Sequence, residues 1–183
     1  MRVLDAQQIQ NILADMRVSK ALLRQLNFSA VREMFDSAWG DYEIFGLPTK
    51  NESAGVLFIE MQGNLYATTY EIGQVGDKTT GRAKPVICDF CKTWQAGGRA
   101  GSITFRLERR SLNSVSFLCC LDLRCSLHVR DMTEAAKSSR AQLREDVTRE
   151  HRIERLNGKL ALLVERLKLE PTMSGLDDST IEV

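Results

Sequence analysis

Long apolar runs and the usual catalytic motifs are missing from this sequence of 183 residues. No stretch approaches the roughly 18 consecutive apolar residues that a bilayer-crossing helix needs. Charge appears at once in the opening Met-Arg-Val-Leu-Asp, so no secretory signal peptide is expected. We therefore expect a cytoplasmic protein that makes no membrane contact.

Catalytic signatures are also absent. The chain has no G-x-S-x-G nucleophile turn, no phosphate-binding glycine loop and no H-E-x-x-H zinc-protease motif. It has two histidines in all, His128 and His151. This scarcity of reactive arrangements favours a binding module over an enzyme.

Charge is nearly balanced overall but unevenly placed. The formal net charge is +1, yet residues 74–130 hold ten Lys/Arg against four Asp/Glu. A basic middle third suits an acidic partner, either a phosphate backbone or an acidic protein surface. A scattering of solvated charges explains the same numbers.

The first 85 residues predict helices followed by a β-hairpin. Asp5 and Gln8 have capping-box spacing, and an apolar face with helical period follows them. Ser19 is the predicted cap of a second short helix. Two segments rich in β-branched and aromatic residues, 55–61 and 65–72, flank a Gln-Gly-Asn turn and so predict a hairpin.

The rest of the chain predicts a small β-unit and helices. Residues 102–109 alternate apolar and polar side chains, and a second strand is expected at 115–119. A helix to Arg130 and a long charged helix over residues 140–169 follow, the latter with a leucine stripe expected to pack on its own domain. We expect an α+β protein with an N-terminal region at 1–85, a second domain at 86–170 and a disordered tail at 171–183.

All five cysteines lie in the basic middle third. Cys88 and Cys91 form a C-x-x-C pair, a spacing that lets two thiolates reach one tetrahedral ion. Clustered thiols in a reducing compartment indicate metal more often than disulfides. A redox pair is the alternative, but it needs a strand-to-helix setting, whereas a glycine turn and a strand pattern follow here.

The second cysteine group is Cys119, Cys120 and Cys125. A C-x-x-C knuckle, a β-hairpin and two more ligands at a helix start form the order of a treble-clef finger. Cys119 and Cys120 point to opposite sides of an extended chain, so one of them binds, and Cys120 stands nearer the helix. Cys125 and His128 have C-x-x-H spacing, which leaves a set with His128 in place of Cys120 as an alternative. Four protein ligands leave no open position, so we expect one structural Zn²⁺ ion.

Three segments resemble a known family. They are Cys88-Asp-Phe-Cys91, the strand Ile103-Thr-Phe-Arg-Leu-Glu-Arg-Arg110, and Phe117 to Arg130, of which Cys120 to Arg130 is the most specific. The chain is similar over residues 86–168 to the elongation-factor-G-binding proteins with a C-terminal treble-clef zinc finger, which include the fusidic-acid-resistance proteins.

The resemblance implies both a ligand set and a partner. The family's zinc ligands fall on Cys88, Cys91, Cys120 and Cys125, and relatives are expected to carry an aromatic residue where His128 stands. Elongation factor G on the bacterial ribosome is the implied partner, and resistance members help it leave ribosomes on which fusidic acid has trapped it.

For the partner surface, our hypothesis is the exposed face of the finger. Arginine and aromatic residues are enriched at interface hot spots, and the candidates are Phe90, Trp94, Arg106, Arg109 and Arg110. The alternative function is a nucleic-acid (ribosomal RNA) binding module, whose affinity would fall steeply with salt. We expect a monomer.

Overall fold

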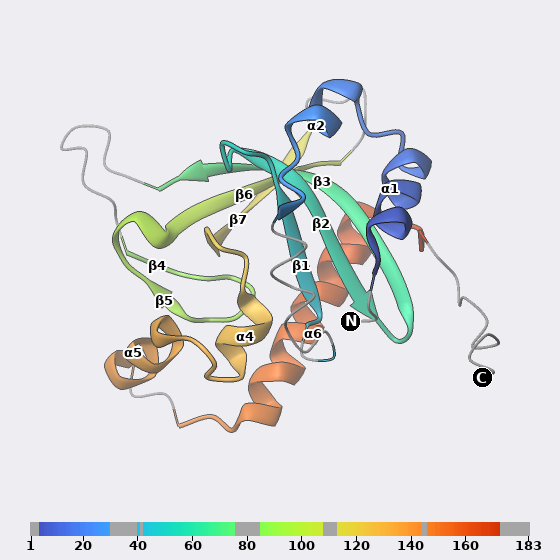
Figure 1. Ribbon diagram of the computed structural model, residues 1–183. Helices are drawn as coiled ribbons and strands as arrows, with labels where there is room; N and C mark the ends of the chain where they lie inside the picture. Colours follow the sequence, from blue (N-terminus) through green and yellow to red (C-terminus); the bar gives the residue numbers. More distant parts are fainter. Residues whose placement is uncertain are drawn as a thin grey trace.

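An antiparallel sheet of five strands in the order β1-β2-β3-β6-β7 organises the computed structural model (Figure 1). The structure describes residues 4–29, 40, 42–75, 85–107, 113–143 and 146–172. The strands of this sheet are β1 (Ile44–Pro48), β2 (Ala54–Met61), β3 (Asn64–Gln74), β6 (Ala100–Arg106) and β7 (Ser114–Cys120). A two-stranded sheet joins β4 (Val86–Ile87) to β5 (Trp94–Gln95). The described helices are α1 (Ala6–Asp15), α2 (Lys20–Gln25), α4 (Cys125–Val129), α5 (Glu134–Leu143) and α6 (Arg149–Leu167). The predicted α+β class is confirmed.

The two predicted N-terminal helices are present with their predicted caps. Asp5 Oδ1 accepts from the Gln8 N–H at 2.7 Å, and Gln8 Oε1 accepts from the Asp5 N–H at 2.9 Å, so the capping box is complete. Ser19 Oγ accepts from the Leu22 N–H at 3.2 Å and starts α2. These side chains satisfy backbone donors that have no partner inside the helix.

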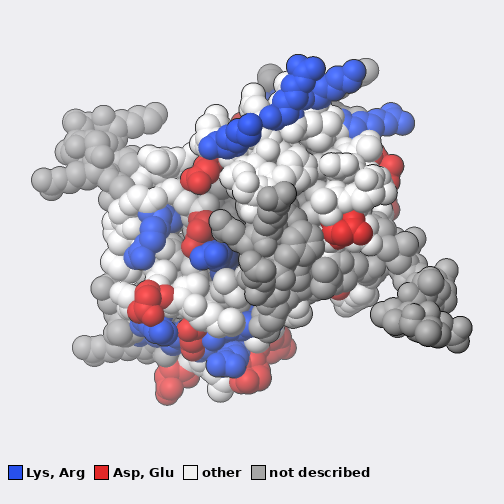
Figure 2. Space-filling view, in the orientation of Figure 1, with Lys and Arg blue, Asp and Glu red and all other residues white. Residues whose placement is uncertain are grey.

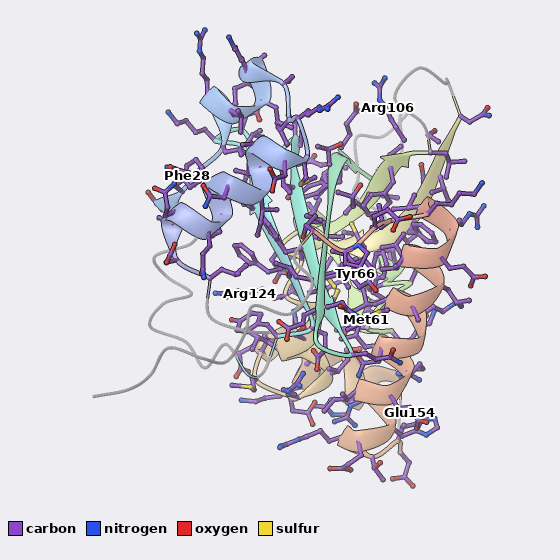
Figure 3. The ribbon with its side chains drawn as sticks, turned by 90° about the vertical axis from the view of Figure 1, so that its right-hand side faces the viewer. Phe28, Met61, Tyr66, Arg106, Arg124 and Glu154 are labelled. Atoms are coloured by element: carbon purple, nitrogen blue, oxygen red, sulfur yellow. The ribbon has the colours of Figure 1, made fainter. Side chains whose placement is uncertain are left out.

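Helices cover the sheet on two sides. In Figure 3, α1 and α2 lie on one side of the sheet and α6 lies on the other, with Met61 and Tyr66 directed toward α6. The side chains of β2 alternate accordingly: Val56 and Phe58 belong to the core under α1, and Leu57 and Ile59 to the core under α6. Because successive side chains of a strand point to opposite faces, β2 contributes apolar residues to both cores.

The hairpin of β2 and β3 is confirmed, whereas β1 was not predicted. Gln62 and Gly63, at the hairpin turn, have φ of 51° and 76°, as a type I′ turn requires. Gly46 and Pro48 argue against a strand in the sequence. They are tolerated because β1 is an edge strand, where a missing N–H breaks no ladder. Tyr42 and Phe45, the aromatic residues in and just before this strand, are buried.

The single helix predicted over residues 140–169 is wrong, because two helices occupy this part of the chain. Thr133 Oγ1 accepts from the Ala136 N–H at 3.1 Å at the start of α5. Thr148 Oγ1 accepts from the His151 N–H at 3.3 Å and caps α6. Both threonines are helix starts that the leucine period alone does not reveal. The predicted packing of the leucine stripe on its own domain is confirmed, since Leu156, Leu160, Leu163 and Leu167 are buried.

Contacts cross the predicted domain boundary between residues 85 and 86. Strand β3 pairs with β6, with Glu71 opposite Thr104 and Ile72 opposite Ile103. The Arg130 guanidinium forms a two-pronged ion pair with the Glu43 carboxylate, at 2.5 and 3.0 Å. The finger and the N-terminal strands therefore share one sheet. Residues 173–183 of the predicted tail lie outside the described residues.

Within the described ranges, no helix combines the length and the apolar character that a bilayer crossing requires.

Alanine substitutions at two glycines are expected to change the stability of the fold in opposite directions. A Cβ at Gly55 would lie 2.3 Å from the Leu47 carbonyl oxygen and 2.6 Å from the Tyr70 hydroxyl, so Gly55→Ala should destabilise the fold by about 1–3 kcal/mol. A Cβ at Gly158, inside α6, meets nothing within 4 Å, so Gly158→Ala should stabilise it by about 1 kcal/mol. Urea unfolding at constant zinc measures both changes. Equal effects of the two substitutions would contradict this account of the Gly55 site.

A candidate metal centre of four cysteines

The first pair of thiols is held by a tight knuckle between β4 and β5. The Cys88 N–H donates to the Thr93 carbonyl at 3.0 Å, and the Lys92 N–H donates to the Cys88 carbonyl at 3.0 Å. Lys92 takes a left-handed conformation, with φ of 60°, directly after Cys91. This turn closes the chain on itself and directs the thiols of Cys88 and Cys91 to the same point.

The second pair comes from the end of β7 and the start of α4. Strand β7 ends at Cys120, and α4 begins at Cys125. In the turn between them, the Leu123 N–H donates to the Cys120 carbonyl at 3.1 Å, and Asp122 Oδ1 accepts from the Arg124 N–H at 3.1 Å. This turn, residues 121–124, brings the two thiols back to one point.

The four sulfur atoms form one buried cluster. The Sγ atoms of Cys88, Cys91, Cys120 and Cys125 all lie within 4.8 Å of one another. Cys88 and Cys125 are 3.7 Å apart at sulfur, and Cys91 and Cys120 are 3.5 Å apart. Ligands at the usual Zn–S bond length around a tetrahedral ion lie about 3.8 Å from each other. The cluster therefore fits one structural Zn²⁺ ion.

The comparison with protein families agrees with this geometry. The family described as "FBP C-terminal treble-clef zinc-finger" matches residues 20–167. This chain belongs to that family. No curated protein and no solved structure matches it. The match begins at α2, so the treble-clef family includes the N-terminal strands as well as the cysteine finger.

Cys119 lies apart from the treble-clef cluster. It precedes Cys120 in β7, so its side chain points to the opposite face of the strand. It is fully buried in the core under α6, and burial raises the pKa of its thiol. It therefore remains a neutral, small apolar side chain.

The cluster binds protons unevenly when no metal neutralises it. Burial raises the pKa of Cys91, but hydrogen bonds from the neighbouring thiols hold it well below its ordinary value. Hydrogen bonding with Cys120 raises the pKa of Cys125. Hydrogen bonding with Cys125 lowers the pKa of Cys120, but hydrogen bonds with Cys88 and Cys91, together with burial, raise it well above its ordinary value. Zinc must displace the remaining thiol protons, so its affinity falls as the pH falls.

His128 lies beside the cluster and is not a member of it. Its Nδ1 is 3.3 Å from Cys120 Sγ and 3.7 Å from Cys91 Sγ. Its Nε2 is 3.5 Å from Asp122 Oδ2, longer than a good hydrogen bond. Burial lowers the pKa of His128, but Asp122 and Cys91 raise it to a net value of about 9. Together with Gln95 Nε2, which donates to Cys120 Sγ at 3.3 Å, the imidazole supplies donors to sulfur.

The structure changes the predicted partner surface. Phe90 is 2% exposed and packs on Phe117 with ring centroids 5.5 Å apart, so its place on that surface is wrong. Trp94 is half-buried on β5, and Arg106 is exposed and pairs with Glu71 at 3.0 Å. Arg109 and Arg110 lie outside the described residues.

Two exposed apolar side chains near the knuckle were missed. They are Ile87 on β4, 45% exposed, and Leu118 on β7, 39% exposed. The alternation of residues 115–119 could have indicated the exposure of Leu118, because this residue occupies a position that points away from the core.

Replacing the two neighbouring cysteines separately tests which one holds the metal. We expect Cys119→Ala to retain one zinc ion per chain and Cys120→Ala to lose it, because only the Cys120 sulfur belongs to the cluster. Elemental analysis of the purified variants by mass spectrometry measures the zinc content. Loss of zinc in Cys119→Ala alone would overturn the assignment.

His128 should strengthen zinc binding without being a ligand. We expect His128→Phe to weaken zinc binding about 10–100-fold, because donors to ligand atoms contribute this much to metal affinity. Competition with a chromophoric chelator measures the affinity, and His151→Phe, at an exposed position of α6, is the matched control. Equal affinity of the two variants would mean that His128 only fills space.

Proposed function

We propose that this protein is a zinc-stabilised binding protein for elongation factor G and has no catalytic activity of its own. The observation that carries the proposal is the buried cluster of four thiols inside a chain that belongs to the treble-clef family. Four protein donors occupy a tetrahedral ion completely and leave no position for a reactive water. The choice of elongation factor G as the partner rests on the segment from Cys120 to Arg130, which resembles the factor-binding proteins.

Zinc has a scaffolding task in this proposal. The knuckle, the end of β7 and the start of α4 are short segments that meet at the cluster of four thiols. Metal–ligand bonds supply folding free energy that such segments lack. The partner therefore recognises a surface that the metal keeps rigid.

The proposed docking surface is the side of β6 and β7 that faces away from α6, here called the open sheet face. Its residues are Ser102, Thr104, Arg106, Ser114, Ser116 and Leu118. Thr104 and Ser116 are hydrogen-bonded at 2.8 Å, and the Leu118 N–H donates to Asp89 Oδ2 at 2.8 Å. An exposed leucine beside hydroxyl and guanidinium groups combines the apolar and polar contacts that interfaces use.

In the cell, binding would act on the factor while it is held on the ribosome. We propose that association promotes release of elongation factor G from ribosomes stalled by fusidic acid. In an assay of translation in a cell-free extract, the protein would then restore synthesis in the presence of the drug.

A second candidate is binding to ribosomal RNA, favoured by one observation. Figure 2 shows Lys and Arg side chains gathered along the edge that carries α2. Lys20 and Arg24 of α2 are exposed there. Lys50 is also exposed, and its backbone N–H donates to the Gln25 carbonyl at the end of α2. Such a basic edge suits a phosphate backbone.

Binding to purified elongation factor G should depend on both the zinc and the open sheet face. We expect Leu118→Asp to weaken binding about tenfold or more, because it replaces the exposed apolar side chain of the proposed interface with a charge. Leu162→Asp is the matched control, since Leu162 is 58% exposed on α6, on the other side of the sheet. Titration calorimetry measures the affinity, and removal of zinc by a chelator should abolish it.

Three results would count against the proposal. Absence of binding with zinc present would reject the factor as the partner. A loss in Leu162→Asp without one in Leu118→Asp would move the interface to α6. Binding to ribosomal RNA fragments that falls steeply with salt, without binding to the factor, would favour the second candidate.

A further inference from the structure

A hollow of about 510 Å³ lies between the sheet and the turn that connects the two C-terminal zinc ligands. Strands β1 and β3 form one side of it through Ile44, Gly46 and Tyr70, and the turn at residues 121–124 forms the other. Ligand pockets in proteins commonly have about 300–1,000 Å³. No part of the proposed function uses this hollow.

Tyr70 is a buried polar group that lines this hollow. It is 3% exposed, and its ring lies over a glycine of β2 and a glycine of β1: a Cβ would lie 2.6 Å from its hydroxyl at Gly55 and 3.3 Å at Gly46. Burial raises the pKa of Tyr70, so the hydroxyl stays neutral. Among the described residues this hydroxyl has no hydrogen-bond partner. The Tyr70 hydroxyl oxygen is not among the described buried atoms that lack a partner, so it is accessible from the hollow, where an acceptor atom of a bound ligand would receive its hydrogen.

Two guanidinium groups line the hollow from the side of the finger. Arg99 and Arg124 are both exposed, and within the described ranges neither forms an ion pair. Two carboxylates, Glu52 and Asp122, line the same hollow. Asp122 already accepts from the Arg124 N–H and faces His128. The charges that line the hollow therefore balance. Each guanidinium still has N–H donors for one carboxylate, whereas the two acids disfavour a polyanion such as a nucleotide.

The remaining walls are apolar. Ile44, Phe45, Ile72 and Leu123 line the hollow, and a Cβ at Gly46 would lie 2.5 Å from Leu123 Cδ1, so the turn fits closely against β1. An apolar body would be buried among these side chains while its charged end met the arginines.

We propose that this hollow, here called the Tyr70 pocket, binds an apolar molecule or chain end that carries a single carboxylate. The carboxylate pairs with Arg99 and Arg124 and accepts the Tyr70 hydroxyl hydrogen, and the apolar body lies against β1 and the turn at residues 121–124. Because that turn connects Cys120 to Cys125, the pocket is complete only when the zinc site is formed. This goes beyond the proposed function and is independent of elongation factor G.

Nuclear magnetic resonance titration of the zinc-loaded ¹⁵N-labelled protein tests the pocket. The probe is 4-phenylbutyrate, and its amide is the neutral control. We expect saturable shifts centred on the amides of Gly46, Tyr70, Gly98 and Leu123, and binding of the amide about tenfold weaker or undetectable. A peptide ending in phenylalanine with a free carboxyl terminus, compared with its amidated form, distinguishes a protein chain end from a free small molecule as the natural ligand.

Substitutions test the contribution of each polar side chain of the Tyr70 pocket to ligand binding. We expect Arg99→Gln combined with Arg124→Gln to weaken 4-phenylbutyrate binding about tenfold or more, and Tyr70→Phe to weaken it about three- to tenfold. Lys137→Gln on α5, remote from the pocket, is the charge-matched control and should leave binding unchanged. Equal binding of the acid and the amide would overturn the proposal, as would shifts centred on Phe117 and Leu162, which line a different hollow beside α6. So would unchanged affinity in the folded, zinc-loaded arginine variant.

Discussion

Tetrahedral coordination by four thiols is the constraint on which the C-terminal half of this protein depends. Cys88 and Cys91 come from a two-stranded knuckle, Cys120 from the last strand of the main sheet, and Cys125 from the first residue of α4. Each of these segments is too short to be stable in isolation, and the buried cluster of sulfur atoms is the point at which all three meet. Bringing four thiolates together without a cation would be strongly unfavourable, because like charges repel in a medium of low polarity. A bound cation neutralises the thiolates and attracts all four, and so joins the knuckle, β7 and α4.

From α4 the constraint extends to the rest of the molecule. Ser126 Oγ, one residue past the last ligand, accepts from the backbone N–H groups of Glu43 and Ile44 at 3.0 and 3.3 Å. Arg130 pairs with Glu43, and the buried Arg152 of α6 donates to the Val129 carbonyl at 3.0 Å and to Asp131 at 2.8 Å. A short helix of the finger thus anchors both β1 and α6. The proposed factor-binding face and the Tyr70 pocket both include residues within two positions of Cys120, so both depend on the same metal.

Local patterns predicted individual elements well and their assembly less well. Asp5 with Gln8, and the glycine turn at Gly63, act within a few residues, so the structure has the helix start and the hairpin that they indicate. Strand β1 was missed because Gly46 and Pro48 disfavour strands locally, and only its edge position and the contact with Leu123 make the strand acceptable. Phe90 was expected at the surface because it stands beside a ligand. Its burial against Phe117 follows from the way the knuckle packs on β7.

The sequence by itself determined that this is a metal-binding α+β protein, because ligand chemistry and spacing are properties of short segments. The C-x-x-C pair and the cysteines before α4 limit which ion fits and how many donors it has. Only the tertiary structure decided between neighbouring candidates. It places Cys120 in the cluster and Cys119 in the core, sets His128 beside two sulfur atoms, and closes a hollow over Tyr70. Strand alternation already favoured Cys120 over Cys119. The position of His128 and the hollow, in contrast, depend on contacts between residues far apart in the chain, which no local pattern encodes.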